Sequence, residues 1–178
     1  MSAQDPPLTL AVGIVPLPCA DYHSEAMSSD RFLKDVRNCA EDRARSLELT
    51  LRHFRADTGT IHELGADGML HLKAWAGDIP ADLLPVIQTI PVGKGIAGLA
   101  VEQKKPVDLC NLQTDASGAS KPRARETGVK GSICVPMMAD AEAVGALGIG
   151  TREERQFQED ETALLLEVGR VLAARRPR

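Results

Sequence analysis

Three glycines near the middle of the chain have the spacing of a phosphate-binding loop. Gly93, Gly95 and Gly98 form a G-x-G-x-x-G pattern that leads into a predicted helix. In a parallel strand–helix–strand unit, such a turn binds a pyrophosphate through backbone N–H groups and the helix N-terminus. Residues 132–138 and 143–150, however, read as strands joined by a turn that is too short for a parallel crossover. We therefore interpret the glycines as a tight turn into a helix that packs closely on an antiparallel sheet.

The cysteines are the next residues that could carry chemistry. Cys19, Cys39, Cys110 and Cys134 include no C-x-x-C pair, so the spacing predicts neither a zinc site nor a thioredoxin-like motif. We expect a reduced, cytoplasmic protein. Cys110 and Cys134 lie in apolar strand patterns, where a free thiol packs as a small hydrophobic side chain. The alternative is redox chemistry, for which these two thiols would have to approach each other across a pocket.

Two histidines and the single tryptophan lie in predicted strands ahead of the glycine turn. His62 and His71 have no companion carboxylate at metal-like spacing, so we expect satisfied or exposed side chains and no metal site. Trp75 lies on the mixed face of its strand. It is predicted to line a pocket wall, with burial in the core as the alternative.

Composition excludes several classes of partner. The chain has 178 residues, of which 43% are hydrophobic and 26% charged, as in an ordinary globular protein, and its net charge is -4. It carries no concentrated basic stripe, so no nucleic-acid partner is expected. The apolar run at 8–17 is too short and too interrupted by Gly13 and Pro16 to span a bilayer. Because that run also lacks a basic flank, we predict no export signal and no membrane partner.

The N-terminal part divides into an arm and the start of a single domain. Residues 1–27 are rich in proline and have no clear period, which predicts an extended arm ahead of a domain at 28–178. Apolar residues from Leu33 to Phe54 recur at spacings of three, four or seven. This periodicity predicts one long amphipathic helix.

A β-hairpin is predicted next, from strands at 60–64 and 70–76 around a turn that contains Asp67-Gly68. Strict alternation along the second strand divides its side chains between two faces. One face is expected to carry Leu70, Leu72, Ala74 and Ala76, and the other His71, Lys73 and Trp75. Residues 81–87 are expected to form one or two helical turns.

The second half of the chain alternates strands with one long polar segment. A strand at 107–112 precedes the polar stretch 113–130, which is long enough to suggest a functional loop and includes a predicted short helix at 122–126. The glycines within 143–150 indicate that a helix or a ligand approaches the strand backbone closely. The final helix, predicted at 158–176, has an apolar stripe wider than one sheet face requires. This width indicates contact with another helix or another subunit.

The order of these elements resembles that of the GAF domain family. The resemblance covers about residues 30–175, and no single segment carries it alone. Its matching segments are 58–64 with 70–77, Ile90-Pro91-x-Gly93-x-Gly95-Ile96-Ala97-Gly98, Pro106-Val107, 131–136, 144–148, and Phe157 followed by Asp160, Glu161 and an apolar helix. The resemblance implies an α+β fold in three layers: a central antiparallel sheet of about six strands with helices on both faces. It also implies that the terminal helices share one face, and that a small-molecule pocket lies on the other under the long loop.

Specialised branches of the family fit this chain less well. The cyclic-nucleotide branch has an Asn-Lys pair ahead of a Phe and an Asp-Glu pair, and here only Phe157, Asp160 and Glu161 are present. The bilin branch uses a Cys-His pair in the loop, which 113–130 lacks. The free methionine-R-sulfoxide reductases carry a cysteine in the glycine turn and more in the loop, and this chain has neither.

The prediction is therefore a sensory or regulatory small-molecule-binding module without catalytic activity. Its alternatives are a ligand-free dimerisation module and a methionine-sulfoxide-reductase-like redox enzyme. The ligand and any cofactor are unknown. A second copy of the chain, bound through the terminal helices, and an effector protein are the expected partners.

The predicted ligand-binding residues are Trp75, Cys110, Asp115, Arg123, Arg125 and Cys134. Arg123 and Arg125 are predicted to clamp an anionic ligand, and Asp115 to order the loop. The alternative for these three is a solvated surface.

Overall fold

Pairing between strands that are distant in sequence organises this molecule, whose computed structural model describes residues 28–114, 116 and 126–175. The predicted arm at 1–27 lies outside these residues, as does nearly all of the predicted short helix at 122–126. The elements are α1 Ser29–Asn38, α2 Arg43–Phe54, β1 Thr58–Leu64, β2 Met69–Ala76, α3 Leu84–Ile87, β3 Thr89–Pro91, α4 Gly95–Gln103, β4 Val107–Leu109, β5 Gly131–Ala139, β6 Glu142–Thr151 and α5 Glu159–Ala174.

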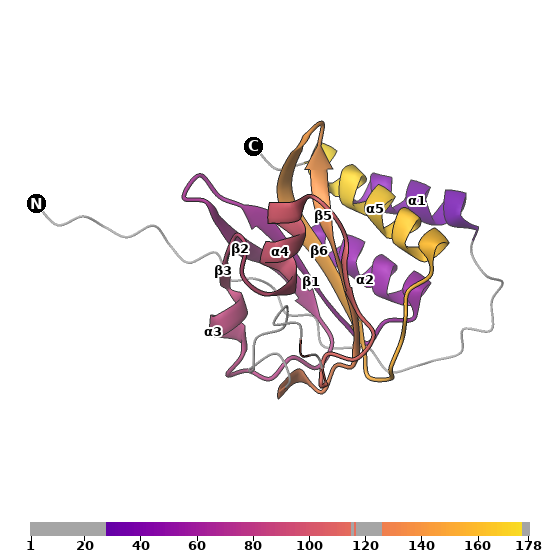
Figure 1. The fold of residues 1–178 in the computed structure, drawn as a ribbon. Coiled ribbons are helices and arrows are strands. Elements are labelled where there is room, and N and C mark those ends of the chain that lie inside the picture. The colour runs from indigo at the N-terminus through magenta and orange to yellow at the C-terminus, as the bar shows by residue number, and fades with distance from the viewer. Residues whose placement is uncertain (1–27, 115, 117–125, 176–178) are drawn as a thin grey trace, which may run out of the picture.

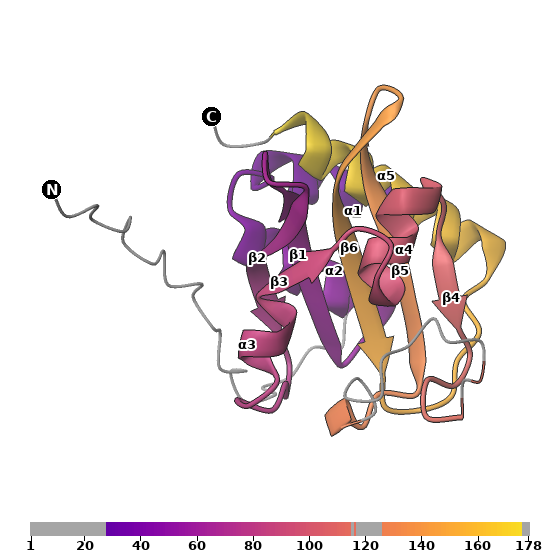
Figure 2. The same cartoon turned by 60° about the vertical axis from the view of Figure 1, so that its left-hand side comes forward.

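The strands form one six-stranded sheet in the order β3-β2-β1-β6-β5-β4 (Figures 1 and 2). Every neighbouring pair in it is antiparallel. The pairing of β1 with β6 joins the two halves of the chain at the centre of the sheet. The predicted antiparallel sheet of about six strands is therefore confirmed. The glycine turn therefore does not lie in a parallel strand–helix–strand unit, which is the unit in which its motif would bind a pyrophosphate.

Three helices cover one face of the sheet. Figure 1 shows α1, α2 and α5 together on that side, where their apolar stripes meet the inward side chains of the central strands. The main hydrophobic core lies between these two layers and includes Phe32, Leu47, Ile61, Ile133, Leu147, Ile149 and Leu165, all at most 2% exposed. A capping box between Gln158 and Glu161 starts α5. The terminal helices thus share one face, as the GAF resemblance implied.

The long N-terminal helix predicted from Leu33 to Phe54 is in fact two helices. Helix α1 ends at Asn38, and α2 begins after Asp42, whose carboxylate accepts a hydrogen bond from the backbone N–H of Arg45. Both helices pack on the same sheet face, so their buried residues keep one helical period across the break. Periodicity alone therefore could not reveal the turn, although Asp42 is a favourable N-cap residue.

A β-bulge interrupts β2, so its side chains do not alternate strictly as predicted. Ile61 pairs with Ala74 but His62 pairs with Leu72, so Lys73 has no partner across the strand pair. The extra residue shifts the alternation by one position, so the side chains beyond it point to the opposite face of the sheet. Leu70 accordingly belongs to the cluster beneath α4, whereas Ala74 belongs to the main core on the opposite face. The expected common face for Leu70, Leu72, Ala74 and Ala76 is therefore wrong.

Helix α4 covers the other face of the sheet, and the glycine motif explains its position (Figure 2). Gly93 and Gly95 have positive φ angles, of 78° and 63°, and the N–H of Gly93 donates to the carbonyl oxygen of Gly98 at 2.9 Å. A Cβ at Gly98 would lie 2.4 Å from the Pro91 carbonyl oxygen, so only glycine fits there. The interpretation of these glycines as a tight turn into a closely packed helix is confirmed.

The later strands agree with the predicted segments. The β5–β6 hairpin has the predicted turn, whereas β4 ends at Leu109, three residues earlier than expected. Pro136 lies beyond the last residue of β5 that pairs with β4, where β6 is the neighbouring strand that it pairs with. None of the helices in the described ranges is long and apolar enough to cross a membrane.

Candidate functional site

Two glycines of β6 form the floor of a trough on the α4 side of the sheet. In the strand register, Gly148 pairs with Thr60 of β1 and with Cys134 of β5. Two residues along the strand, Gly150 pairs with Thr58 and Ser132 in the same way. Polar side chains of β1 and of β5 therefore flank β6 on its two sides. The two glycines of β6 place no side chain between them. Neighbouring strands are about 4.8 Å apart, so the two flanks are separated by about 10 Å.

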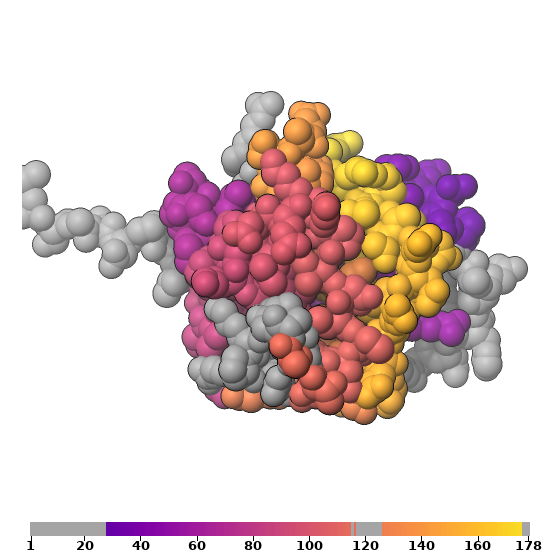
Figure 3. Space-filling model, in the orientation of Figure 1, coloured from indigo at the N-terminus to yellow at the C-terminus, as the bar shows by residue number. Residues whose placement is uncertain are grey.

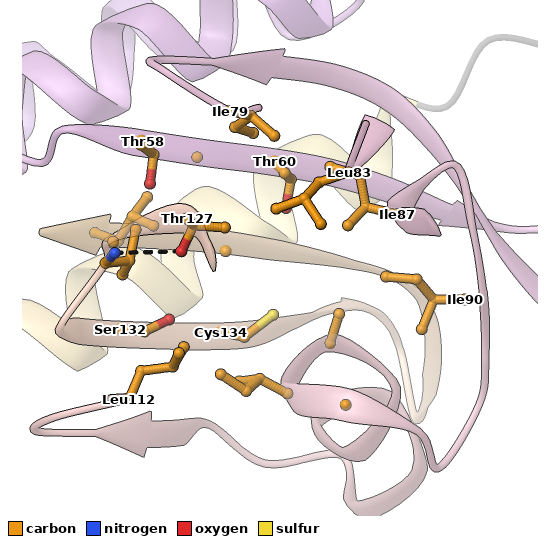
Figure 4. Close-up of a pocket in the computed structure, with 18 of the residues that line it drawn as sticks. Thr58, Thr60, Ile79, Leu83, Ile87, Ile90, Leu112, Thr127, Ser132 and Cys134 are labelled. Atoms are coloured by element: carbon orange, nitrogen blue, oxygen red, sulfur yellow. Dashed lines mark hydrogen bonds between the residues drawn. The ribbon is translucent and has the colours of Figure 1, made fainter. Parts of the chain in front are cut away.

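A cavity of about 210 Å³ lies over this trough (Figure 4). Its walls come from the segment that includes α3, from the start of α4 and from residues at both ends of the long loop. The described residues that line it are Thr58, Gly59, Thr60, Ile79, Leu83, Val86, Ile87, Ile90, Lys94, Gly95, Ile96, Ala97, Leu112, Thr127, Val129, Ser132, Cys134, Gly148, Ile149 and Gly150. From outside, α4 and its flanking segments (pink to red) hide most of the strands beneath them (Figure 3).

The lining is apolar with a few neutral polar groups. Isoleucine, leucine and valine side chains form most of the wall, and the hydroxyls of Thr58, Thr60 and Ser132 lie among them (Figure 4). Burial raises the pKa of the Cys134 thiol to about 12, so this group is a neutral S–H at pH 7. Within the described lining only Lys94 carries a charge, and its side chain is exposed. Such a lining suits an apolar ligand with few polar groups.

His62 holds one wall of the cavity in place. Its Nε2 lies 2.8 Å from the carbonyl oxygen of Ile87, at the end of α3. A carbonyl only accepts, so this hydrogen bond assigns the proton to Nε2 and leaves Nδ1 as a lone pair. Nδ1 is buried and has no hydrogen-bond partner among the described residues. Burial lowers the pKa of His62 to about 4, which makes it a neutral structural tether at pH 7.

The predicted site residues fall into three groups. Cys134 lines the cavity, and β2 places Trp75 opposite Thr60, yet the half-buried Trp75 is not among the lining residues. Cys110 is exposed and does not line the cavity. The remaining three predicted residues, Asp115, Arg123 and Arg125, lie outside the described residues, so their roles stay predictions.

The two strand cysteines do not approach each other across the cavity. Cys134 pairs with Val107, and Cys110 lies three residues further along the chain, after β4. That offset is roughly 10 Å along the strand, beyond the roughly 7 Å between Cα atoms that a disulfide can bridge. The described part of the chain also contains no group of three or more His, Cys, Asp or Glu side chains that could hold a metal ion.

Hydrogen bonds connect the base of the long loop to the segment that leads into α5. The N–H of Arg155 donates to the Cys110 carbonyl oxygen at 3.3 Å, and that of Gly131 donates to the Glu153 carbonyl oxygen at 3.1 Å. The Arg155 guanidinium donates to the Phe54 carbonyl oxygen at 2.6 Å and forms an ion pair with Glu161. Arg155 therefore contacts the loop base, the end of α2 and the first turn of α5.

Several cavity residues were missed by the sequence reasoning. Thr58, Thr60 and Ser132 are ordinary strand residues, and no motif distinguishes them. The signal that was present is glycine spacing, since Gly148 and Gly150 indicated a close approach to the strand backbone. The expectation of a pocket on this face agrees with the cavity, although its polar groups come mostly from residues that were not singled out.

A six-stranded antiparallel sheet with terminal helices on one face and a lined cavity on the other defines a domain of the GAF fold class. The sequence matches the family described as GAF domain over residues 44–174. The chain therefore belongs to the GAF domain family, whose members are in general sensory or regulatory modules. No curated protein matches the sequence.

Solved structures of GAF domains share this fold. A GAF domain from a phosphoenolpyruvate-protein phosphotransferase of Coxiella burnetii is 24% identical, with a TM-score of 0.67, covering 85% of this chain and 94% of that one. The corresponding domain from Acinetobacter is 17% identical, with a TM-score of 0.67 and coverage of 82% and 88%. A free methionine-R-sulfoxide reductase from Neisseria meningitidis, solved with its substrate, is 17% identical, with a TM-score of 0.66 and coverage of 86% and 91%. At these identities the likeness concerns the fold alone.

Proposed function

We propose that this chain is a sensory module that binds a small molecule in the cavity over Gly148 and performs no catalysis. The observation that carries the proposal is the cavity itself, about 210 Å³ of space between the sheet and α4 with hydroxyl groups along its floor. Well-packed cores leave few voids of this size, so a cavity with convergent polar groups favours ligand binding.

The chemistry of the lining favours binding over turnover. The thiol of Cys134 lines the cavity, and burial holds it protonated rather than as the reactive thiolate. A redox cycle would also need a resolving thiol within reach, and Cys110 lies on the outside of the molecule. His62 is engaged with Ile87 and does not line the cavity, so it is not placed to act as a base.

The same strands connect the cavity to the helical face. Thr60, Cys134 and Gly148 face the cavity, whereas their neighbours Ile61, Ile133 and Leu147 belong to the core under α1, α2 and α5. A ligand that shifts these strands also shifts the surface on which the helices pack. Arg155 supplies a second connection, from the loop base to the first turn of α5. Both support a signal that leaves through the terminal helices.

The output of such a signal needs a partner. We propose a homodimer formed through the terminal helices, and an effector protein that responds to their packing. The wide apolar stripe of α5 supports the dimer, since Leu164, Leu166 and Val171 are only partly buried against the core. The predicted roles of Trp75 and Asp115 in ligand binding belong to this proposal too. The predicted clamp of Arg123 and Arg125 applies only if the ligand is an anion.

Native mass spectrometry of the purified protein tests the ligand directly. We expect an added small mass per subunit that disappears on denaturation, and that is lost in Gly148→Val, where the new side chain occupies the cavity floor. Ala163→Val, which places the same valine side chain on the exposed side of α5, is the matched control and should retain the mass. A dimer without added mass, whose stability no metabolite in a broad screen changes, would favour the ligand-free dimerisation module instead.

A further inference from the structure

We propose that the cavity selects an uncharged, compact and mainly apolar ligand, about one ring in size, whose polar group lies between Thr60 and Cys134. This proposal rests on the proposed function, because it takes the cavity as a binding site. It adds the charge, the size and the orientation of the ligand.

The charge of the ligand follows from the charge of the walls. Within the described lining the one charged side chain, that of Lys94, is exposed to water. The polar groups at the floor, including Thr60, Ser132 and Cys134, are neutral hydroxyls and a neutral thiol. A charged ligand group at this floor would lose its hydration without gaining an opposite charge from the described lining, which is unfavourable. An uncharged ligand avoids that loss, and the isoleucine and leucine walls favour its apolar surface.

The size of the ligand follows from the space over Gly148. A Cβ built on Gly148 would lie 3.4 Å from the Thr60 hydroxyl oxygen and 3.5 Å from the Cys134 sulfur, which is ordinary van der Waals contact. The floor is therefore open at that point, whereas a Cβ on Gly150 would meet Val129 at 2.7 Å. Benzene binds in engineered apolar cavities of about 150 Å³. A volume of about 210 Å³ consequently accepts one ring with a short substituent.

The orientation follows from which groups lack partners. Within the described residues no hydrogen bond engages the hydroxyl of Thr60 or the thiol of Cys134. Each can donate and accept, and polar groups in apolar surroundings are normally paired. Figure 4 shows these two side chains on either side of β6, facing the cavity. A hydroxyl or carbonyl on the ligand would satisfy one or both, so this pair marks the polar end of the site.

The test compares three one-ring probes of nearly equal size that differ in charge: benzyl alcohol, benzoate and benzylamine. Binding to the full chain is followed by ¹H–¹⁵N NMR at pH 7, using the amide signals of Thr60 and Cys134. We expect saturable shifts with benzyl alcohol and dissociation constants about tenfold or more higher for the two charged probes. Gly148→Val should abolish the saturable shifts, and Ala163→Val should leave them unchanged.

A second comparison locates the polar group. Thr60→Val keeps the shape of the side chain and removes its hydroxyl. It should weaken benzyl alcohol about 2- to 12-fold, the range of one hydrogen bond, and leave toluene unaffected. Thr89→Val, at an exposed position on β3, is the matched control and should change neither probe.

The outcomes separate the two proposals. If benzoate or benzylamine binds more tightly than benzyl alcohol and Gly148→Val abolishes that binding, the cavity remains a ligand site and the neutral-ligand inference is wrong. Tight binding of benzoate would then favour the predicted anion clamp of Arg123 and Arg125. Saturable shifts that persist in Gly148→Val would overturn both proposals, because binding would then lie outside the cavity. No saturable shift with any probe would overturn the one-ring ligand alone, and the added mass in native mass spectrometry still decides the proposed function. An equal loss of toluene and benzyl alcohol in Thr60→Val would overturn the assigned orientation.

Discussion

The ring of His62 in β1 and the backbone of Ile87 in α3 are joined by one hydrogen bond, 2.8 Å from Nε2 to the carbonyl oxygen. Ile87 lines the cavity, and the two residues are 25 positions apart in the chain. The buried side chain of His62, in the central sheet, thus holds Ile87 in its position in the cavity wall. Because Nδ1 is buried without a described partner, the ring can hold this position only while it is neutral.

This relationship predicts a pH-dependent stability. The pKa of His62 is lowered to about 4 in the folded protein, whereas an unfolded histidine has a pKa near 6.5. Between these values the unfolded chain binds more protons, so the free energy of unfolding should fall as the pH drops from 6.5 to 4 and be flat above 6.5. The full effect is about 3 kcal/mol, with a slope of at most about 1.4 kcal/mol per pH unit.

Urea denaturation at a series of pH values checks this prediction. The contribution of His62 is the difference between the wild type and His62→Gln, whose amide still donates but does not titrate. The variant should lose part of the slope between pH 6.5 and 4. Parallel curves for the two proteins across that interval would contradict the assignment.

The buried ion pair between Arg43 and Glu63 predicts a strong dependence of stability on both partners. Their closest atoms, Arg43 Nη2 and Glu63 Oε1, are 2.7 Å apart, and the guanidinium also donates to the carbonyl oxygens of Ala40 and Arg175. Removing one partner leaves a buried charge, at a cost of about 3–5 kcal/mol. Arg43→Met and Glu63→Leu should each show this loss in chemical denaturation. The double variant should recover much of it, and simple additivity would argue against the pair.

The glycine turn predicts unequal costs for two similar substitutions. Gly98→Ala would place a methyl group against the Pro91 carbonyl oxygen and should destabilise by about 1–3 kcal/mol or more, because the backbone must move. Gly95→Ala meets no atom within 4 Å, and its cost is the positive φ of 63°, about 1–2 kcal/mol. Thermal unfolding of both variants gives the comparison. Equal costs would mean that α4 packs less closely on β3 than the structure has it.

Thiol accessibility should distinguish Cys110 from Cys134. Cys110 is exposed, whereas Cys134 is 4% exposed and its thiol has a pKa of about 12. Alkylation requires the thiolate, so iodoacetamide at pH 8 should modify Cys110 in the native protein and Cys134 only on unfolding. Peptide mapping by mass spectrometry follows each site separately. Rapid native modification of Cys134 would instead indicate an open, reactive thiol and would revive the redox alternative.

Arg155 predicts a joint response of α2 and α5. Its guanidinium bonds the Phe54 carbonyl oxygen and Glu161, and it lies over the Phe157 ring at 4.6 Å from the centroid. Arg155→Met should accelerate hydrogen exchange at the start of α5 and at the end of α2 together. Arg170→Met, at an exposed ion pair on α5, is the control and should change neither region. A change confined to one helix would argue against Arg155 as the connection between them.

Much of the fold was predictable because local patterns and pairing rules agree for it. The β5–β6 hairpin is required by two apolar runs with a turn too short for a crossover, and the glycine turn was read correctly once that hairpin was recognised. The errors came from single residues without a strong local signal. The break near Asp42 preserves the helical period, and the unpaired Lys73 reverses the facing of β2 without any glycine or proline to mark it.

The sequence by itself determined the class of the domain, since periodicity, turn lengths and glycine spacing are local properties that one chain displays directly. Only the tertiary structure decided the site. Thr60, Gly148 and Cys134 are separated by many residues in the chain and meet because β6 lies between β1 and β5. Likewise, only that register places Cys110 away from Cys134. A cavity is a property of side chains brought together by long-range pairing, and no local pattern in a strand encodes which distant residues will lie beside it.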